Sequence, residues 1–148
     1  MFSTTIFGIL SNDSLAPERE LMIMRAFIVE DSLAVIERLV ALLSDVQGVE
    51  ITGQSAEVSE AIESIRITKP DVIILDIQLA GGCGLDVLRD IRQCESSAVV
   101  IVFTNDSFPQ ARQRCLDAGA NFFLDKATEF ERLIEIFRVL VKRSPKRG

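Results

Sequence analysis

The sequence predicts an α/β protein in which helices cover both faces of a doubly wound parallel sheet. Short runs of consecutive apolar residues recur along the chain, as in strands that are buried on both faces. They are separated by longer segments with apolar residues three and four positions apart, which is typical of helices. Several of the apolar runs end in a polar or charged residue. In parallel α/β sheets, ligands bind at this carboxyl edge.

The central strand is predicted at residues 72–76, where four apolar residues are followed by Asp76. A second apolar run at residues 26–29 is followed at once by Glu30 and Asp31. The remaining predicted strands are a weakly alternating edge strand at 49–53, a run at 99–103 that ends in Thr104, and a run at 121–124 that precedes Asp125 and Lys126.

Five helices are predicted between and after these strands. Asp31 or Ser32 can cap the first, and residues 78–84, which contain three glycines, form a loop before the third. Gly119 stands where a C-terminal cap would end the fourth helix. The helices are expected at residues 32–43, 61–69, 85–91, 109–118 and from 128 onward.

Alternating strands and helices with short right-handed connections predict a flavodoxin-like sheet with strand order 2-1-3-4-5. In this order strands one, three, four and five are neighbours. The polar residues at their carboxyl ends would therefore form one cluster.

A length of 148 residues and an apolar content of 48% suit one domain with one core. We assign this domain to residues 24–143, after an extension at 1–23 and before a basic tail at 144–148. Whether the extension belongs to the native protein is left open, because Met22 and Met24 are also candidate translation starts. No apolar stretch reaches the roughly 18 residues that would predict a membrane span.

The charge and the rare residue types exclude several classes of function. A net charge of -6 argues against nucleic acid or an anionic membrane as the main partner. The absence of histidine excludes Ser-His and Cys-His nucleophile pairs and imidazole metal ligands. Three cysteines without a CxxC pair predict neither a zinc site nor a disulfide framework, so reduced thiols in the cytoplasm are expected.

The predicted cluster contains three carboxylates, from Glu30, Asp31 and Asp76. Two such charges about 4 Å apart repel by roughly 4 kcal/mol at an effective dielectric constant of about 20, so the cluster needs a counter-charge. Oxygen ligands in an open cleft suit Mg²⁺, while Lys126 adds a positive charge and Thr104 a hydroxyl group. This set of groups can receive a phosphoryl group on a carboxylate.

Asp76 is the best candidate nucleophile because it stands alone after the central strand. Asp31 is expected to bind the metal directly, and Glu30 through a water molecule. Taken singly, these acids could merely begin a helix or a loop. Thr104 could likewise be a helix cap, Lys126 a surface lysine and Phe123 a core residue.

Several motifs together resemble the receiver domain of two-component response regulators, over about residues 24 to 143. They are the segment 27–31, Asp76 with Gly84 eight residues later, the segment 102–104, and Gly119-Ala120 followed by Phe123 and Lys126.

The resemblance implies that Asp76 accepts phosphate from a phosphohistidine on a sensor kinase or a histidine phosphotransfer protein. It implies Mg²⁺ held by Asp31, Asp76 and the backbone carbonyl of Gln78. It also implies that Thr104 and Phe123 form a switch pair, which alters the protein-binding face built by the fourth helix, the fifth strand and the fifth helix.

The same resemblance implies a bacterial, cytoplasmic, stand-alone receiver that catalyses at most its own phosphorylation and dephosphorylation. Its downstream target would be a protein, and whether phosphorylation pairs two copies is left open. Gln78 and Asp106 match positions that tune phosphate loss. Ala80 and Ala127 depart from the family, which commonly has proline at both positions, and this puts the geometry of the two loops in question.

Two other classes of function are kept. One is an interaction module with this fold that has lost switching, which the altered loops permit. The other is a small phosphotransferase or phosphatase that uses an aspartyl phosphate, but Gln78 stands where such an enzyme would have a second acid.

Overall fold

A five-stranded parallel sheet runs through the middle of the protein, whose computed structural model describes residues 23–143. The strand order β2-β1-β3-β6-β7 is the predicted doubly wound order, so this prediction is confirmed. The strands are β1 (Met24–Val29), β2 (Val49–Ser55), β3 (Val72–Leu75), β6 (Val99–Thr104) and β7 (Phe122–Asp125).

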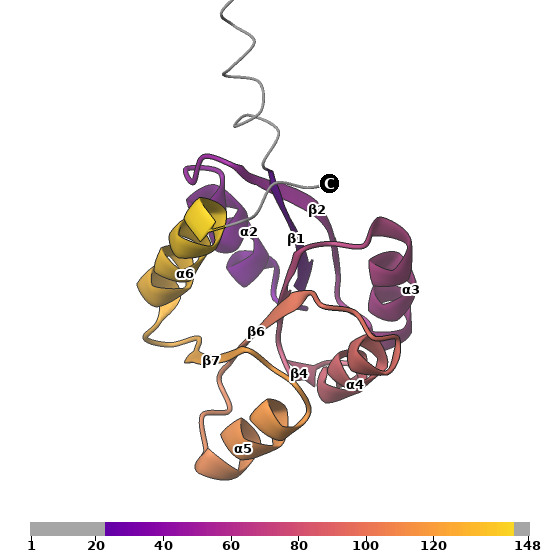
Figure 1. The fold of residues 1–148 in the computed structure, drawn as a ribbon. Helices are drawn as coiled ribbons and strands as arrows, with labels where there is room; N and C mark the ends of the chain where they lie inside the picture. The colour runs from indigo at the N-terminus through magenta and orange to yellow at the C-terminus, as the bar shows by residue number, and fades with distance from the viewer. Residues whose placement is uncertain (1–22, 144–148) are drawn as a thin grey trace, which may run out of the picture.

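Helices cover both faces of this sheet (Figure 1). Among the described residues, two helices pack on one face and three on the other. In the described part of the chain they are α2 (Leu33–Leu43) and α6 (Phe130–Arg143) on one face, and α3 (Val58–Thr68), α4 (Leu85–Gln93) and α5 (Pro109–Asp117) on the other.

The core consists of two apolar layers, one on each side of the sheet. Ile28 and Ile74 point into the layer that contains Phe137 of α6, whereas Phe27 and Leu75 point into the layer beneath α3, α4 and α5. Neighbouring residues of a strand face opposite sides of the sheet. Each of them must therefore be apolar when helices exclude water from both faces. This explains the unbroken apolar runs of the central strands.

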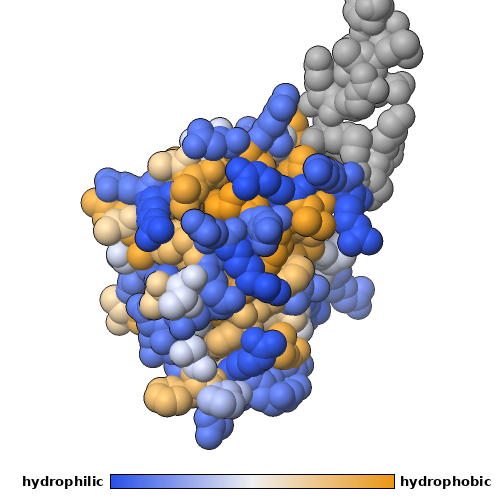
Figure 2. All heavy atoms as spheres, turned by 90° about the vertical axis from the view of Figure 1, so that its left-hand side faces the viewer, coloured by the Kyte–Doolittle hydropathy of each residue, from blue (hydrophilic) through white to orange (hydrophobic). Residues whose placement is uncertain are grey.

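The outer faces of the helices are mixed in polarity. On the side of the molecule that carries α2 and α6, polar residues are interspersed with apolar ones (Figure 2). Val40 of α2 and Val139 of α6 are exposed there. Other apolar residues of the same two helices pack inward against the sheet.

The segment predicted as a loop at residues 78–84 contains a small hairpin, so that part of the prediction was wrong. Strand β4 (Gln78–Leu79) pairs antiparallel with β5 (Gly82–Cys83). The two-residue connection between them is Ala80-Gly81, and neither residue has a positive φ. The three glycines indicated a tight turn, but the pattern did not show that its flanks would pair.

Two element boundaries also differ from those predicted. Helix α3 begins at Val58 rather than near residue 61, because the Glu57 side chain caps it by accepting a hydrogen bond from the Glu60 N–H. Helix α6 begins at Phe130 rather than Thr128, since residues 125–129 form a turn closed by the Asp125 carbonyl oxygen.

The expected extension and basic tail lie outside the described residues, apart from Ile23. Within the described range 23–143, no helix combines the length and the apolar character that crossing a bilayer requires.

Candidate functional site

The register of the sheet brings the predicted acids to one edge. Val29 of β1 pairs with Leu75 of β3, and Leu75 pairs with Val102 of β6. Glu30 directly follows Val29 and Asp76 directly follows Leu75, so both acids leave the sheet at the same level. The Asp76 N–H donates to the Val29 carbonyl oxygen over 3.0 Å, which holds the two strand ends together.

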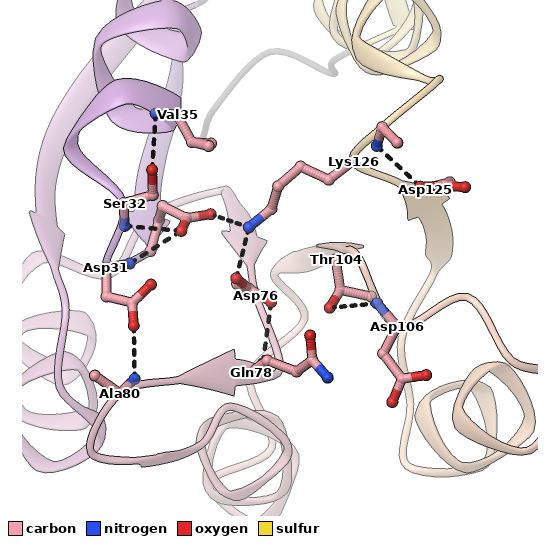
Figure 3. A network of polar contacts seen from close by, with 12 residues as sticks. Asp31, Ser32, Val35, Asp76, Gln78, Ala80, Thr104, Asp106, Asp125 and Lys126 are labelled. Atoms are coloured by element: carbon pink, nitrogen blue, oxygen red, sulfur yellow. Dashed lines mark hydrogen bonds and ion pairs between the residues drawn. The ribbon is translucent and has the colours of Figure 1, made fainter.

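Lys126 lies between two of the acids (Figure 3). Its ammonium Nζ donates to Asp76 Oδ2 at 2.6 Å and forms an ion pair with Glu30 Oε1 at 2.7 Å. All three side chains are buried. The backbone of Lys126 is fixed by its own N–H, which donates to the Thr104 carbonyl oxygen over 2.9 Å.

Burial and pairing have opposite effects on the pKa of Lys126. Burial alone would lower the pKa of this lysine, but the hydrogen bonds to Asp76 and Glu30 raise it above its ordinary value, so the ammonium stays charged. Burial also raises the pKa of Glu30, and the nearby Asp76 charge adds to that effect. One ammonium therefore compensates only part of the negative charge at this edge.

Glu30 has partners on both carboxylate oxygens. Oε1 contacts Lys126, while Oε2 accepts the N–H groups of Asp31 at 3.1 Å and Ser32 at 2.9 Å. Ser32, rather than Asp31, is the N-cap of α2, and its hydroxyl oxygen accepts the Val35 N–H at 3.4 Å. Glu30 thus ties the start of the helix to the lysine.

Asp31 is exposed and reaches across to the hairpin. Its Oδ2 accepts the Ala80 N–H at 2.6 Å (Figure 3). Its other oxygen accepts no hydrogen bond from any residue in the described range. Asp31 therefore has one oxygen that is free to bind a cation.

The three carboxylates fit a hard divalent cation. One oxygen from each of Glu30, Asp31 and Asp76 lies within 4.8 Å of the other two. Oxygen donors of this kind, open on one side to water, are what Mg²⁺ takes in proteins. Asp31 has one oxygen without a hydrogen-bond partner among the described residues, so this exposed carboxylate suits a direct bond to the cation.

The backbone around Asp76 is fixed by its own neighbours. Asp76 Oδ1 accepts the Gln78 N–H at 3.0 Å. The Gly84 N–H donates to the Ile77 carbonyl oxygen over 3.0 Å, which closes the hairpin back onto the end of β3. A Cβ atom at Gly84 would overlap the Asp76 carbonyl oxygen and lie 2.9 Å from Ile77 Cα. Only glycine fits there.

Thr104 lies at the end of β6, on the side of Asp76 that faces away from Asp31 (Figure 3). Its side chain is fully buried, and its hydroxyl oxygen accepts the Asp106 N–H at 3.3 Å. Phe123 pairs with Val102 in the neighbouring strand and is also buried. The guanidinium of Arg112 on α5 lies 5.9 Å from the centre of the Phe123 ring.

The loop after Lys126 does not need proline. The described residues contain no cis peptide bond, and the Ala127 N–H donates to Asp125 Oδ1 at 2.9 Å. Alanine supplies here a donor that proline lacks. The position of the Lys126 side chain therefore follows from the strand end and this turn.

Two features of the site were not predicted from the sequence. The Ala80 N–H is a backbone donor, which the residue type alone does not reveal. Arg112 lies eleven residues before Phe123, and only the packing of α5 against β7 brings the two together. The helical spacing of α5 could have indicated which of its residues face the sheet, but not that one of them is a cation above this ring.

A cavity of about 540 Å³ lies away from this cluster, between α3 and α4. It is lined by Lys69, Asp71 and Ser97, which flank the opposite ends of β3 and β6. The Arg66–Asp90 ion pair stands at its wall with a separation of 2.6 Å. The cavity therefore shares no residue with the carboxylate cluster.

Comparison with known proteins gives a consistent result. Residues 26–138 match the family model described as the response regulator receiver domain. The DNA-binding transcriptional activator EvgA of Escherichia coli strain K12 is 31% identical over 113 residues, which are 75% of this chain and 54% of that protein. The chain thus spans about half the length of curated relatives such as EvgA and GacA.

Solved structures agree with the family model. A LuxR-family two-component response regulator from Aurantimonas sp. SI85-9A1 is 25% identical with a TM-score of 0.75, covering 81% of this chain and 86% of its own. A LuxR-family DNA-binding response regulator from Staphylococcus aureus is also 25% identical, with a TM-score of 0.74 and coverage of 80% and 99%.

Proposed function

This chain belongs to the response regulator receiver domain family, and from that premise we propose that Asp76 accepts a phosphoryl group in two-component signalling. The donor would be a phosphohistidine on a sensor kinase or a histidine phosphotransfer protein. The phosphorylated chain would then change how one of its faces binds a protein.

The observation that carries this proposal is the contact of Lys126 Nζ with Asp76 Oδ2 inside the carboxylate cluster. A buried lysine beside two buried acids is costly to desolvate unless each group has a partner. Here Lys126 reaches both acids, and Asp31 adds an exposed carboxylate beside them. Such an arrangement suits a site that must neutralise an incoming dianion next to a nucleophilic carboxylate.

In the proposed reaction, a carboxylate oxygen of Asp76 forms a bond to phosphorus while the phosphorus–nitrogen bond of the donor breaks. The leaving imidazole retains the electron pair and takes up a proton from water. Lys126 and the Thr104 hydroxyl would contact the phosphoryl oxygens. Mg²⁺, held by Asp31, Asp76 and the Gln78 carbonyl with Glu30 through water, would supply positive charge to the same oxygens.

The readout we propose uses Thr104 and Phe123. Thr104 lies beside Asp76 at the end of β6, and Phe123 lies one strand away beneath Arg112. A hydroxyl that moves toward the phosphoryl group would free space that the ring can enter. The face built by α5, β7 and α6 would change with it. Asp106 and Gln78 flank the site at the positions expected to tune phosphate loss.

The remaining features belong to the same proposal. The chain would act as a cytoplasmic, bacterial receiver whose output is a protein contact, and not as an enzyme with a substrate of its own. EvgA is named as a DNA-binding activator, but the match covers 54% of its length, so we do not transfer DNA binding to this chain.

The test is incubation with acetyl phosphate and Mg²⁺, followed by intact-mass measurement. The parent protein is expected to gain one phosphoryl group and Asp76→Asn none. Asp45→Asn, which alters an exposed acid outside the cluster, is the matched control and should gain one. An adduct on Asp76→Asn as well would mean that another residue takes the phosphoryl group. No adduct on the parent, even with a phosphohistidine donor, would instead support an interaction module that works without phosphorylation.

A further inference from the structure

We propose that the backbone N–H of Ala80 positions Asp31 for cation binding, so that the β4–β5 hairpin is part of the metal site. The inference rests on the proposed Mg²⁺ site. It adds the Ala80 N–H to that site, a group that does not bind the metal itself. Proline at residue 80 could not provide this N–H.

The contact itself joins distant parts of the chain. The Ala80 N–H lies 2.6 Å from Asp31 Oδ2, and 49 residues separate the two. Within the described residues, Asp31 Oδ2 accepts this hydrogen bond and Oδ1 accepts none. Without Ala80, an exposed carboxylate on a short side chain would sample several rotamers. The hydrogen bond selects one of them.

The donor can position Asp31 only if the hairpin is itself fixed, and three contacts fix it. Its strands pair with each other. On one side it lies against the start of α3, because a Cβ atom at Gly82 would come within 3.0 Å of Val58 Cγ2. At its end, Gly84 lies directly against the backbone of Asp76. The Ala80 N–H is therefore held relative to Asp76.

Hydrogen bonds to metal ligands set ligand orientation, and removing one typically weakens metal affinity by about 10- to 100-fold. The bond to Ala80 occupies Oδ2 and leaves Oδ1 of Asp31 for the cation. Mg²⁺ needs near-octahedral geometry, so an oriented carboxylate lowers the entropic cost of binding. Because coupling between sites is reciprocal, a bound cation should in turn strengthen the contact between Asp31 and the hairpin.

Ala80→Pro removes this donor with little other change. Residue 80 is the first of the two turn residues and its φ is not positive, which the fixed negative φ of proline requires. Leu79 before it is in a strand, which is the conformation that proline prefers in its predecessor. Ala80→Ser is the matched control, because it changes the side chain and keeps the N–H.

The first measurement is Mg²⁺ titration by calorimetry on the full chain, without a phosphodonor. Ala80→Pro is expected to raise the Mg²⁺ Kd about tenfold, at the lower end of such effects, while Ala80→Ser leaves it unchanged. Equal affinity in Ala80→Pro and the parent, or tighter binding in Ala80→Pro, would overturn the inference.

The second measurement needs neither metal nor the proline variant. Amide hydrogen exchange of Ala80 is expected to be faster in Asp31→Ala than in the parent, and close to the parent rate in Asp31→Asn, whose amide oxygen can still accept. Equal exchange of Ala80 in the parent and Asp31→Ala would show that the bond does not form in solution.

The two proposals fail separately. If Asp76 takes no phosphoryl group while Ala80→Pro weakens Mg²⁺ binding, the proposed function falls and the role of Ala80 stands. If Asp76 is phosphorylated while Ala80→Pro binds Mg²⁺ as tightly as the parent does, the proposed function stands and the role of Ala80 falls.

Discussion

The ammonium of Lys126 lies 2.6 Å from the carboxylate of Asp76, with side chains only 8% and 4% exposed. The two residues are 50 positions apart in the sequence. They meet because β3 and β7 both flank β6 and because all three strands run in the same direction. The same ammonium also pairs with Glu30, so it contacts both buried acids of the site.

Replacing Lys126 should cost stability as well as function. In Lys126→Met, Glu30 and Asp76 would lose the charge that both contact. Removing one partner of a buried ion pair typically costs about 3 to 5 kcal/mol. We expect a loss of this size in the free energy of unfolding by urea, partly restored by Mg²⁺. Lys142→Met, which alters an exposed lysine of α6, is the control, and equal stability in the two variants would contradict the account.

Gly84 should tolerate no side chain, because a Cβ atom there would overlap the Asp76 carbonyl oxygen. Forcing extra atoms into a packed region typically costs about 1 to 3 kcal/mol. Gly84→Ala is therefore expected to unfold at lower urea concentration and to bind Mg²⁺ more weakly than the parent.

Gly81→Ala is the control for Gly84→Ala. Its added Cβ would come no closer than 4.0 Å to Glu57 Cγ, an ordinary van der Waals contact. Gly81 lies in the turn of the hairpin and Gly84 directly follows its second strand, so a comparable loss in Gly81→Ala would mean that the close approach at Gly84 is not what matters.

The Thr104 hydroxyl should contribute to both structure and phosphorylation. Its oxygen accepts the Asp106 N–H, and losing a buried acceptor leaves that donor unsatisfied at a cost of about 1 to 3 kcal/mol. Thr104→Ala is expected to lose stability and to accept phosphate more slowly from acetyl phosphate. Thr104→Ser retains the hydroxyl and should keep most of the rate; a serine variant as slow as the alanine variant would assign the effect to the methyl group.

Cysteine reactivity should separate the surface from the core. Cys83 and Cys94 are exposed, whereas Cys115 lies on the buried face of α5. Burial raises the pKa of the Cys115 thiol, with smaller effects from neighbouring charges. Alkylation of the native protein at mildly basic pH should therefore label the two exposed cysteines, and denaturation in urea should allow labelling of the third. Labelling of Cys115 in the native state would contradict the described packing.

The same pKa shift has a consequence for stability. The fold disfavours the thiolate of Cys115. The buried neutral thiol therefore contributes its full share to the free energy of unfolding below the ordinary thiol pKa, and this share is lost as the pH rises through the higher pKa of the folded protein. Cys115→Val, which cannot ionise, should lose less stability than the parent as the pH rises above the ordinary thiol pKa. Urea unfolding at neutral and at basic pH measures the difference.

Strand and helix order could be predicted because burial on both faces forces unbroken apolar runs, as in Val72–Leu75. Parallel strands then end at one edge, which was enough to place Glu30, Asp31 and Asp76 together. Pairing within a two-residue strand such as Gln78–Leu79 has no such periodic signal. The donor at Ala80 was missed for a related reason, since it belongs to the backbone and depends on where the hairpin lies.

The cap of α3 was missed because glutamate is not among the preferred capping residues, yet Glu57 accepts the Glu60 N–H at 3.2 Å. The start of α6 was placed too early because the helical spacing of its apolar residues does not distinguish a preceding turn. In both places local hydrogen bonds, rather than hydrophobic periodicity, decide the boundary.

The central claim is that Asp76 carries the phosphoryl group as an acyl phosphate. Hydroxylamine displaces phosphate from such a group and leaves a hydroxamate on the carboxyl carbon, whereas phosphate esters of serine and threonine do not react in this way. After treatment with acetyl phosphate and Mg²⁺ and then hydroxylamine, peptide mass mapping should find the hydroxamate at Asp76. A hydroxamate at Asp31 or Glu30 instead, or a phosphorylated protein that forms none, would contradict the account.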